Sequence, residues 1–355
     1  MKFFLAAMLT VMSCSSWKQG DFEKEIKKSS EARPDVNGDK ELLEKFEVQP
    51  VATAVPEVPA PEKKSTPLRS SPPIKKTTQA PVKVTKTSTP EVTSGPKIEA
   101  KSSIPQDYPA EMKNLNKKAQ QVWSKYRPNH VLNQQVYLNI NYLGMTVGKI
   151  MFTNKGKKMI NNKEVWHLHA RFKSAPFYSK IYELDDTVDT YVTADQFLSI
   201  RYSLVQRESK QDIDDLQLHD RDQLKTFWFY KQKKTNEPVK KKDKDSYIPY
   251  FSIDPFSVLF FYQGLPLNNG DVYEIPIINK AKILVLKSVV EGREVVRTAH
   301  GDTKAIRVHA TTQYSGEHLK SGDLYFWFSD DEKRTLIKAR AKIKIGSVTA
   351  EIVDG

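Results

Sequence analysis

The stretch that decides the fold lies near the end of the chain, at residues 322–353. It contains a run of five apolar residues, 324–328 (LYFWF), followed by a charged segment, 329–334 (SDDEKR). Residues 337–352 then alternate between apolar and polar side chains. An apolar run, a charged turn and an alternating run are typical of a β-hairpin. We therefore predict that these residues form a hairpin that closes a sheet.

The same alternation recurs upstream, in about a dozen short strand-like runs that begin near Val136. Two segments have a helical pattern instead. Residues 109–126 carry one apolar stripe, preceded by Asp107 as a candidate cap, and in residues 254–262 Asp254 acts as the cap. The patterns predict a mainly β fold: an antiparallel curled sheet, either an open barrel or a sandwich, with two short covering helices.

The chain begins with a targeting segment. Lys2 precedes a short apolar region that ends near Met12 and is too short to span a bilayer. Residues 11–14 (VMSC) resemble the lipobox of bacterial lipoproteins, and Cys14 is the only cysteine of the chain. We expect a signal peptide over residues 1–13 and acylation of Cys14, for example with palmitate. The expected location is the periplasmic face of the outer membrane. The alternative is an ordinary secretory signal with a chance cysteine.

Composition divides the rest of the chain into two parts. Twelve of the twenty prolines lie in residues 50–109, and no aromatic residue lies between Phe46 and Tyr108. Such a composition buries too little apolar surface to offset the entropy of ordering. We therefore predict a disordered tether over residues 14–106 and a β-rich domain over residues 107–355.

The positive charge of the tether bears on its partners. From Lys63 to Lys101 there are nine Lys or Arg and two Glu, a net charge of +7 out of +13 for the whole chain. This segment is either a solvated spacer or a contact to the cell wall or to lipid headgroups. Nucleic acid is excluded as a partner because the basic residues are not interleaved with aromatics. A second basic run, residues 231–244, is predicted to be a loop.

Three motifs resemble the DUF3108 family. They are residues 142–148 (YLGMTVG), residues 254–262 (DPFSVLFFY), and residues 327–331 (WFSDD) together with residues 342–348 (KIKIGSV). The resemblance covers about residues 130–353. It implies an exported bacterial envelope protein of β-rich fold. The function of that family is unknown, so the resemblance implies no catalytic residue.

Two groups of polar residues are candidates for chemistry. His167 and His169 share one strand face with Arg171, which would repel a cation, so we expect an ordinary polar face and no metal. The adjacent carboxylates at residues 185–186, 214–215 and 330–331 are predicted to lie in turns.

Three aromatic runs, at residues 227–230, 256–262 and 325–328, have apolar side chains on both faces. One face of each run therefore requires a cover. The cover is either the two predicted helices or a bound acyl chain or apolar peptide. If it is a ligand, the candidate contacts are Trp228, Tyr230, Phe256, Phe260, Phe326 and Phe328.

No phosphate-binding loop, nucleophile elbow or paired-His zinc helix occurs in the sequence. We therefore expect a non-enzymatic protein without a cofactor, whose β domain binds an apolar or amphipathic envelope component such as a lipid or a lipoprotein. The first alternative is an envelope scaffold or adaptor that docks on other proteins or on the cell wall. The second is an envelope hydrolase. The oligomeric state stays open.

Overall fold

The computed structural model describes residues 33–51, 104–129, 135–314, 317–318, 323–343 and 346–354. Within these ranges the protein is mainly β, as the sequence predicts. Its helices are α3 (Lys40–Lys45), α4 (Ala110–Trp123), α5 (Pro176–Ser179), α6 (Val258–Phe261) and the 3-10 turn η1 (Tyr262–Gly264). None of the helices in these ranges is long and apolar enough to cross a membrane.

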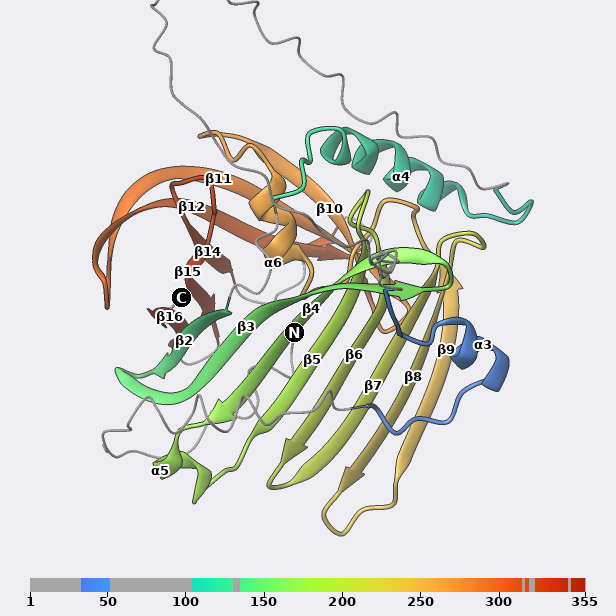
Figure 1. The fold of residues 1–355 in the computed structure, drawn as a ribbon, viewed down its shortest axis with the longest axis horizontal. Helices are drawn as coiled ribbons and strands as arrows, with labels where there is room; N and C mark the ends of the chain where they lie inside the picture. The colour runs from blue at the N-terminus through green and yellow to red at the C-terminus, as the bar shows by residue number, and fades with distance from the viewer. Residues whose placement is uncertain are drawn as a thin grey trace, which may run out of the picture. The chain divides into compact units, whose positions relative to one another are not determined.

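One antiparallel sheet contains all sixteen strands of the described residues (Figure 1). Its strands follow the order β10-β11-β12-β14-β15-β16-β2-β3-β4-β5-β6-β7-β8-β9, with β1 and β13 attached to β3 and β12. Their bounds are β1 (Gln49–Pro50), β2 (Gln135–Tyr142), β3 (Met145–Ile160), β4 (Lys163–Ser174), β5 (Asp185–Thr193), β6 (Ser199–Glu208), β7 (Gln211–Asp220), β8 (Lys225–Lys234), β9 (Lys240–Tyr247), β10 (Val272–Asn279), β11 (Lys282–Thr298), β12 (Gly301–Tyr314), β13 (Glu317–His318), β14 (Leu324–Ser329), β15 (Leu336–Lys342) and β16 (Ser347–Asp354).

The C-terminal hairpin lies in the middle of this order rather than at an edge. β14 pairs with β12, and β16 pairs with β2, so Ala350 lies opposite Ile140. The alternating run that predicts one long strand is divided into β15 and β16. Gly346 has a φ of +82°, and the Ile343 amide donates to its carbonyl at 3.1 Å. Glycine permits this backbone conformation, so the chain reverses there and adds a third strand to the predicted hairpin.

The sheet curls but does not close into a barrel, because β9 and β10 stand at opposite ends of the pairing order. Side chains link the two ends instead. Lys280, in the β10–β11 turn, forms an ion pair with Asp215 of β7 at 3.2 Å. Ser246 of β9 donates to the carbonyl of Ala281 at 3.1 Å. The curl is therefore held by side-chain contacts rather than by a complete ladder of backbone hydrogen bonds.

The sheet has two faces, which we call the interior face and the outer face, and one row of side chains across the strands identifies each. The interior face carries the row Leu168, Thr190, Tyr202, Gln217, Trp228 and Lys244 across β4 to β9. The outer face carries the row His169, Asp189, Ser203, Leu216, Phe229 and Asp243. Because side chains alternate along a strand, these two rows point to opposite sides. Figure 1 shows α6 lying inside the curl, on the interior side.

Both predicted helices are present. α4 runs from Ala110 to Trp123 and packs against β10. The predicted cap is wrong, because Pro109 is the N-cap residue, and the Asp107 carboxylate accepts from the Tyr247 hydroxyl at 2.6 and 2.7 Å instead. In the second segment regular helix is confined to α6 and η1, and Asp254 caps the turn that leads into them.

Part of the predicted tether is ordered on the outer face. Residues 33–51 include α3 and β1, and Phe46 is 2% exposed in a cluster with Val165, Tyr191 and Leu218. A few large apolar side chains suffice here because the sheet offers an apolar surface on which to bury them. The prediction of disorder is therefore wrong for this segment. The remaining parts of the predicted tether, residues 14–32 and 52–103, lie outside the described residues, as do the signal peptide and Cys14.

The prediction of a loop at the second basic run is also wrong. Residues 231–244 do not form a loop: they comprise the end of β8, a turn, and the first part of β9. β9 is an edge strand, and lysines on an edge discourage pairing with another chain. Its charge therefore suits a strand as well as a loop.

Candidate functional site

Asp254 is the centre of a buried hydrogen-bond network that holds the α6 segment on the interior face. Its side chain is fully buried, and Oδ2 accepts from the hydroxyls of Thr190 and Ser199 at 2.6 Å and from that of Ser257 at 2.5 Å. Oδ1 accepts from the amides of Phe256 and Ser257, both at 2.9 Å. One carboxylate thus joins β5, β6 and the turn before α6.

Aromatic rings fill the space around this segment. Tyr262 lies 6.0 Å from Phe326 and 5.6 Å from Phe328, measured between ring centroids. Phe256 stacks on Phe152 at 5.7 Å and meets Phe260 edge-on at 5.5 Å. Four of the six candidate ligand contacts therefore pack around the α6 segment, and Phe328 is fully buried. At these four positions the α6 segment supplies the cover that the sequence requires.

α4 covers the other side of that segment. The Trp123 ring lies 4.5 Å from the Phe261 ring, and Tyr126 stacks on Phe261 at 4.7 Å. Gly264 is required at this contact, since a Cβ there would approach Tyr126 Cε2 to 2.3 Å. The two predicted helices therefore pack on each other as well as on the sheet.

Trp228 and Tyr230, the other two candidate contacts, lie elsewhere on the interior face. Their rings are 5.6 Å apart, and Lys280 Nζ lies 5.8 Å from the Trp228 centroid and 5.0 Å from that of Tyr230. Trp228 Nε1 donates to Asp215 Oδ1 at 3.2 Å. Burial raises the pKa of Asp215, and the charge of Lys280 opposes that shift. The Trp228 side chain is only half-buried.

Cations line the edge of the interior face beside Trp228. Lys244 lies opposite Trp228, Lys242 opposite Tyr230, and Lys240 opposite Gln232. All three lysines are exposed. The other face of β9 is mixed in charge, with Lys241, Asp243 and Asp245. Among the described residues, no carboxylate forms an ion pair with Lys242 or Lys244, whereas Lys240 pairs with Glu237 at 2.8 Å.

A buried acid lies further along the interior face. Asp186 accepts from Gln206 Nε2 at 2.8 Å and from the Arg207 amide at 3.1 Å. Burial, with smaller contributions from Glu208 and Asp185, raises the pKa of Asp186 to about 7. The predicted turn role is wrong for residues 185–186 and for residues 214–215, which lie within β5 and β7. The sequence underestimates how many carboxylates this sheet buries.

The predicted polar face at His167 and His169 is buried. His167 Nε2 and His169 Nδ1 lie 2.6 and 2.7 Å from the same oxygen, Asp189 Oδ1. Burial alone would raise the pKa of Asp189, but its contacts with the two imidazoles outweigh burial and lower it. The sequence does not identify Asp189 as their partner, because the register of β4 against β5 is needed to place it there.

A hollow of about 480 Å³ opens elsewhere, at one end of β3 to β6. It is lined by polar and charged side chains that include Lys157, Glu164, Asp195 and Arg221, and by none of the six candidate contacts. Lys157 and Glu164 form an ion pair at 2.8 Å across this region. A hollow lined by paired charges does not suit an apolar ligand.

Arg221 has a structural role that the sequence does not indicate. It is fully buried and donates to the carbonyls of Ser199, Tyr250 and Ser252. Burial lowers the pKa of its guanidinium to about 9. It fixes the segment that leads to Asp254, and no motif surrounds it that could have revealed this role.

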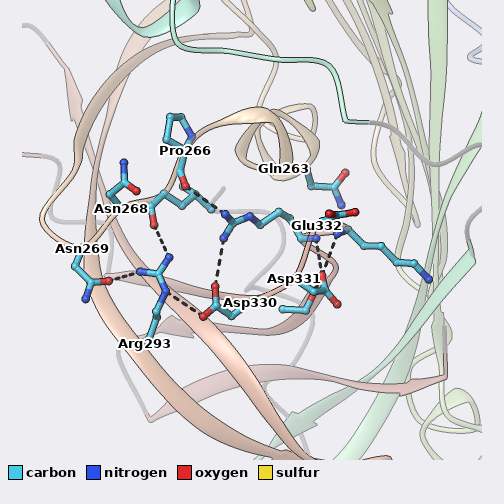
Figure 2. A network of polar contacts seen from close by, with 12 residues as sticks. Gln263, Pro266, Asn268, Asn269, Arg293, Asp330, Asp331 and Glu332 are labelled. Atoms are coloured by element: carbon cyan, nitrogen blue, oxygen red, sulfur yellow. Dashed lines mark hydrogen bonds and ion pairs between the residues drawn. The ribbon is translucent and has the colours of Figure 1, made fainter. Parts of the chain in front are cut away.

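The turn between β14 and β15 is tied to the loop that follows η1 (Figure 2). Arg293 Nε donates to Asp330 Oδ2 at 3.0 Å, and Arg334 Nη2 donates to the Pro266 carbonyl at 3.3 Å. Asp331 Oδ1 accepts from the Ser329 hydroxyl at 2.7 Å and from the Arg334 amide at 3.1 Å. The predicted turn role of residues 330–331 is confirmed.

These features define an open, curled antiparallel sheet whose interior holds a short helical segment. The chain belongs to the DUF3108 family, proteins of unknown function, which it matches over residues 135–353. That range includes the three motifs that suggest the family in the sequence. No curated protein matches the chain.

Three solved structures are similar to this chain. The first is a β-barrel-like protein of the domain of unknown function DUF1849 from Brucella abortus, with 10% identity, 63% of this chain and 97% of that chain covered, and a TM-score of 0.40. The second is a proposed lipoprotein from Parabacteroides distasonis, with 9% identity, coverage of 64% and 97%, and a TM-score of 0.26. The third is a proposed exported protein with a YmcC-like fold from Bacteroides fragilis, with 9% identity, coverage of 64% and 96%, and a TM-score of 0.28.

Proposed function

We propose that the protein is a non-enzymatic component of the bacterial cell envelope whose curled sheet binds an anionic amphipathic molecule of the envelope, such as a lipid. In this proposal acylated Cys14 anchors the chain to the outer membrane on its periplasmic side. The basic residues from Lys63 to Lys101 then lie in the spacer between anchor and sheet, where they can contact anionic headgroups or the cell wall.

The observation that carries the proposal is the separation of charge on β9 next to a half-buried ring. Lys240, Lys242 and Lys244 point to the interior face, and the acidic residues of the strand, Asp243 and Asp245, point away from it. Trp228 lies directly opposite Lys244 on the neighbouring strand. A half-buried aromatic ring bordered by cations suits a ligand with an apolar part and an anionic head.

The binding free energy gained per buried methylene of the ligand is comparable to that gained per lysine at its anionic head. Each methylene that an acyl chain buries contributes about 0.8 kcal/mol. Each lysine near an anionic headgroup contributes about 1 kcal/mol. Lys242 and Lys244 together are therefore expected to account for about 2 kcal/mol, or roughly thirtyfold in affinity. Phe256, Phe326 and Phe328 are excluded from this contact surface because their rings are buried.

Quenching of tryptophan fluorescence tests the proposal. Brominated lysophosphatidylglycerol is titrated into the purified full chain, and brominated lysophosphatidylcholine, which lacks the net negative charge, serves as the comparison. We expect saturable quenching that is stronger with the anionic lipid. Trp228→Phe should remove most of it, whereas Trp327→Phe, on the outer face, should leave it nearly intact.

Two variants of β9, one on each face of the strand, test the role of the lysines. Lys242→Gln combined with Lys244→Gln should weaken binding of the anionic lipid about thirtyfold. Lys241→Gln removes one of the same charges from the opposite face of the same strand and should have almost no effect. Equal quenching by both lipids, or equal effects of the variants on the two faces, would contradict the proposal. A complete lack of lipid uptake would favour the scaffold alternative.

A further inference from the structure

The outer face contains a second arrangement that the proposed function does not use. His167 and His169 lie on β4, and Asp189 lies on β5 directly opposite His169. The exposed fractions of the three side chains are 0%, 1% and 5%. One carboxylate oxygen, Asp189 Oδ1, lies within hydrogen-bond distance of both imidazoles. Two nitrogens and one carboxylate oxygen therefore converge in the interior of the protein.

One of the two neighbouring cations that would oppose a metal ion, Arg171, is already paired; the other is Arg201. Arg171, the next residue on this face of β4, donates from Nε and Nη2 to the two carboxylate oxygens of Asp185 at 2.7 and 2.6 Å. This pairing removes the repulsion that the sequence alone suggests. Asp189 is an ionised carboxylate in a buried position, where an uncompensated charge is costly, and the charge of Arg201 offsets it in part.

Some of the polar atoms on this face are left unsatisfied by the protein. Within the described residues, His169 Nε2 is buried and has no hydrogen-bond partner. The Thr187 hydroxyl, two residues from Asp189 on the same face of β5, is also buried without one. Buried polar atoms are nearly always satisfied in native proteins, by water or an ion where protein groups do not do so. The polar network on this face is therefore incomplete, although His169 Nε2 is not the ring nitrogen that faces Asp189.

We propose that His167, His169 and Asp189 form a Zn²⁺ site with one open coordination position. Imidazole nitrogens and a carboxylate oxygen are common zinc ligands, and three protein ligands leave a fourth position for water or another group. The ligand atoms lie within 4.8 Å of one another. A bound ion would tie β4 to β5 on the face that residues 33–51 cover.

Ion binding requires a small rearrangement. Ligand atoms around a tetrahedral zinc ion lie about 3.3 Å apart, given bond lengths of about 2.0 Å. The separations of 2.6 and 2.7 Å in this structure are those of hydrogen bonds. The ion takes the place of the hydrogen atoms that the imidazoles share with Asp189 Oδ1, and the three ligand atoms move to the separations that a tetrahedral ion requires.

Competition with a chromophoric zinc chelator tests the site in the purified full chain. We expect one tightly bound ion per chain in the wild type. His169→Gln and Asp189→Asn should each weaken the binding at least about tenfold. His309→Gln is the matched control, because this histidine lies on the outer face near Glu291 and Asp323, away from the cluster. Cys14 is present in every variant and does not contribute to the differences.

Spectroscopy with Co²⁺ as the probe separates a metal site from a structural cluster. Bound Co²⁺ should give the absorption of a four-coordinate ion in the wild type and lose it in Asp189→Asn. Far-ultraviolet circular dichroism of the variants checks that they are folded. If Asp189→Asn is folded and binds Zn²⁺ as well as the wild type, or if the wild type binds no better than the variants, the proposal is wrong.

A folding defect in the variants would not leave the question open. Thermal melting of the wild type alone, with Zn²⁺ and with Mg²⁺, provides an independent readout, because an ion that binds only the folded state raises the melting temperature. We expect a rise with Zn²⁺ and none with Mg²⁺, which prefers oxygen ligands. Equal melting temperatures in Zn²⁺ and Mg²⁺ would overturn the proposal.

Discussion

Two aspartates on β5 show how differently the two faces of the sheet treat a buried charge. Asp186 points to the interior face, and Asp189, three residues along the strand, points to the outer face. Burial raises the pKa of Asp186 to about 7, with Glu208 nearby. The pKa of Asp189 is lowered because His167 and His169 outweigh burial. At these two positions, therefore, the interior face favours a neutral acid and the outer face favours an ionised one.

The two faces also differ in what covers them. The α6 segment, held by Asp254, covers part of the interior face and belongs to the range that matches the family. Residues 33–51 cover part of the outer face and lie outside that range. The interior cover is joined to the sheet by buried hydrogen bonds, whereas the outer cover combines apolar burial around Phe46 with the pairing of β1 on β3 and the ion pair of Lys45 with Asp220 at 2.6 Å. We expect the two covers to respond differently to mutation.

The largest effect is expected from Asp254→Ala on the interior side. The change leaves the hydroxyls of Thr190 and Ser199 and two backbone amides buried without their acceptor. The free energy of unfolding should fall by about 3 to 5 kcal/mol, as measured by urea denaturation. Asp195→Ala, at an exposed aspartate, is the control and should change it by less than about 0.5 kcal/mol. A similar small loss in Asp254→Ala would show that the network does not hold the segment.

On the outer side, Phe46→Ala should release the cover and spare the sheet. Loss of this buried ring destabilises the docking of residues 33–51 by about 3 kcal/mol. Hydrogen exchange at the α3 amides should accelerate about a hundredfold, while β5 to β7 keep their protection. Val51→Ala, at a side chain that is 40% exposed, serves as the control. Equal loss of protection in α3 and in the sheet would show that the two faces are not independent.

A pH series on Asp186→Asn tests the difference between the two aspartates. An acid with a raised pKa contributes stability below its ordinary pKa of about 4 and loses it as the pH rises through about 7. Relative to the wild type, Asp186→Asn should therefore gain on the order of 2 kcal/mol between pH 4 and pH 8. Denaturation curves at several pH values measure this gain. A stability difference between variant and wild type that does not change with pH would rule out the raised pKa.

The smallest effect is expected at the turn between β14 and β15, in the contacts that Figure 2 shows. Asp330→Ala removes the ion pairs with Arg293 and Arg334, which are partly exposed. Such pairs contribute about 1 kcal/mol or less. We expect a loss of that size in thermal melts at low ionic strength and a smaller one in high salt. A loss that salt does not reduce would mean that Asp330 acts through packing or hydrogen bonds instead.

Much of the fold can be read from the sequence because its signals are local. The strand character of residues 324–328 and 337–352 and the Asp254 cap depend only on neighbouring residues, and both are predicted correctly, although the break of the alternating run at Gly346 is not. The sequence does not predict that residues 33–51 are ordered, because Phe46 is buried by strands that lie far away in the sequence. β9 was missed for a different reason: its lysines suit a solvated loop and an edge strand equally well.

The candidate sites depend on register, which the sequence does not reveal. The pairing of His169 with Asp189 and of Trp228 with Lys244 is set by strand neighbours. The alternation of Lys240, Lys242 and Lys244 could have been noticed, because one-sided charge at a period of two is a strand signal. That four of the six candidate aromatic contacts pack around α6 could be learned only from the three-dimensional arrangement.

Native mass spectrometry of the full chain purified from envelope membranes tests the ligand-binding role most directly. We predict a population that carries one amphipathic molecule, is depleted by organic extraction, and is restored by adding lysophosphatidylglycerol to the wild type but not to the Lys242→Gln, Lys244→Gln variant. A chain that shows only its own mass before extraction, and takes up no lipid afterwards, would contradict it.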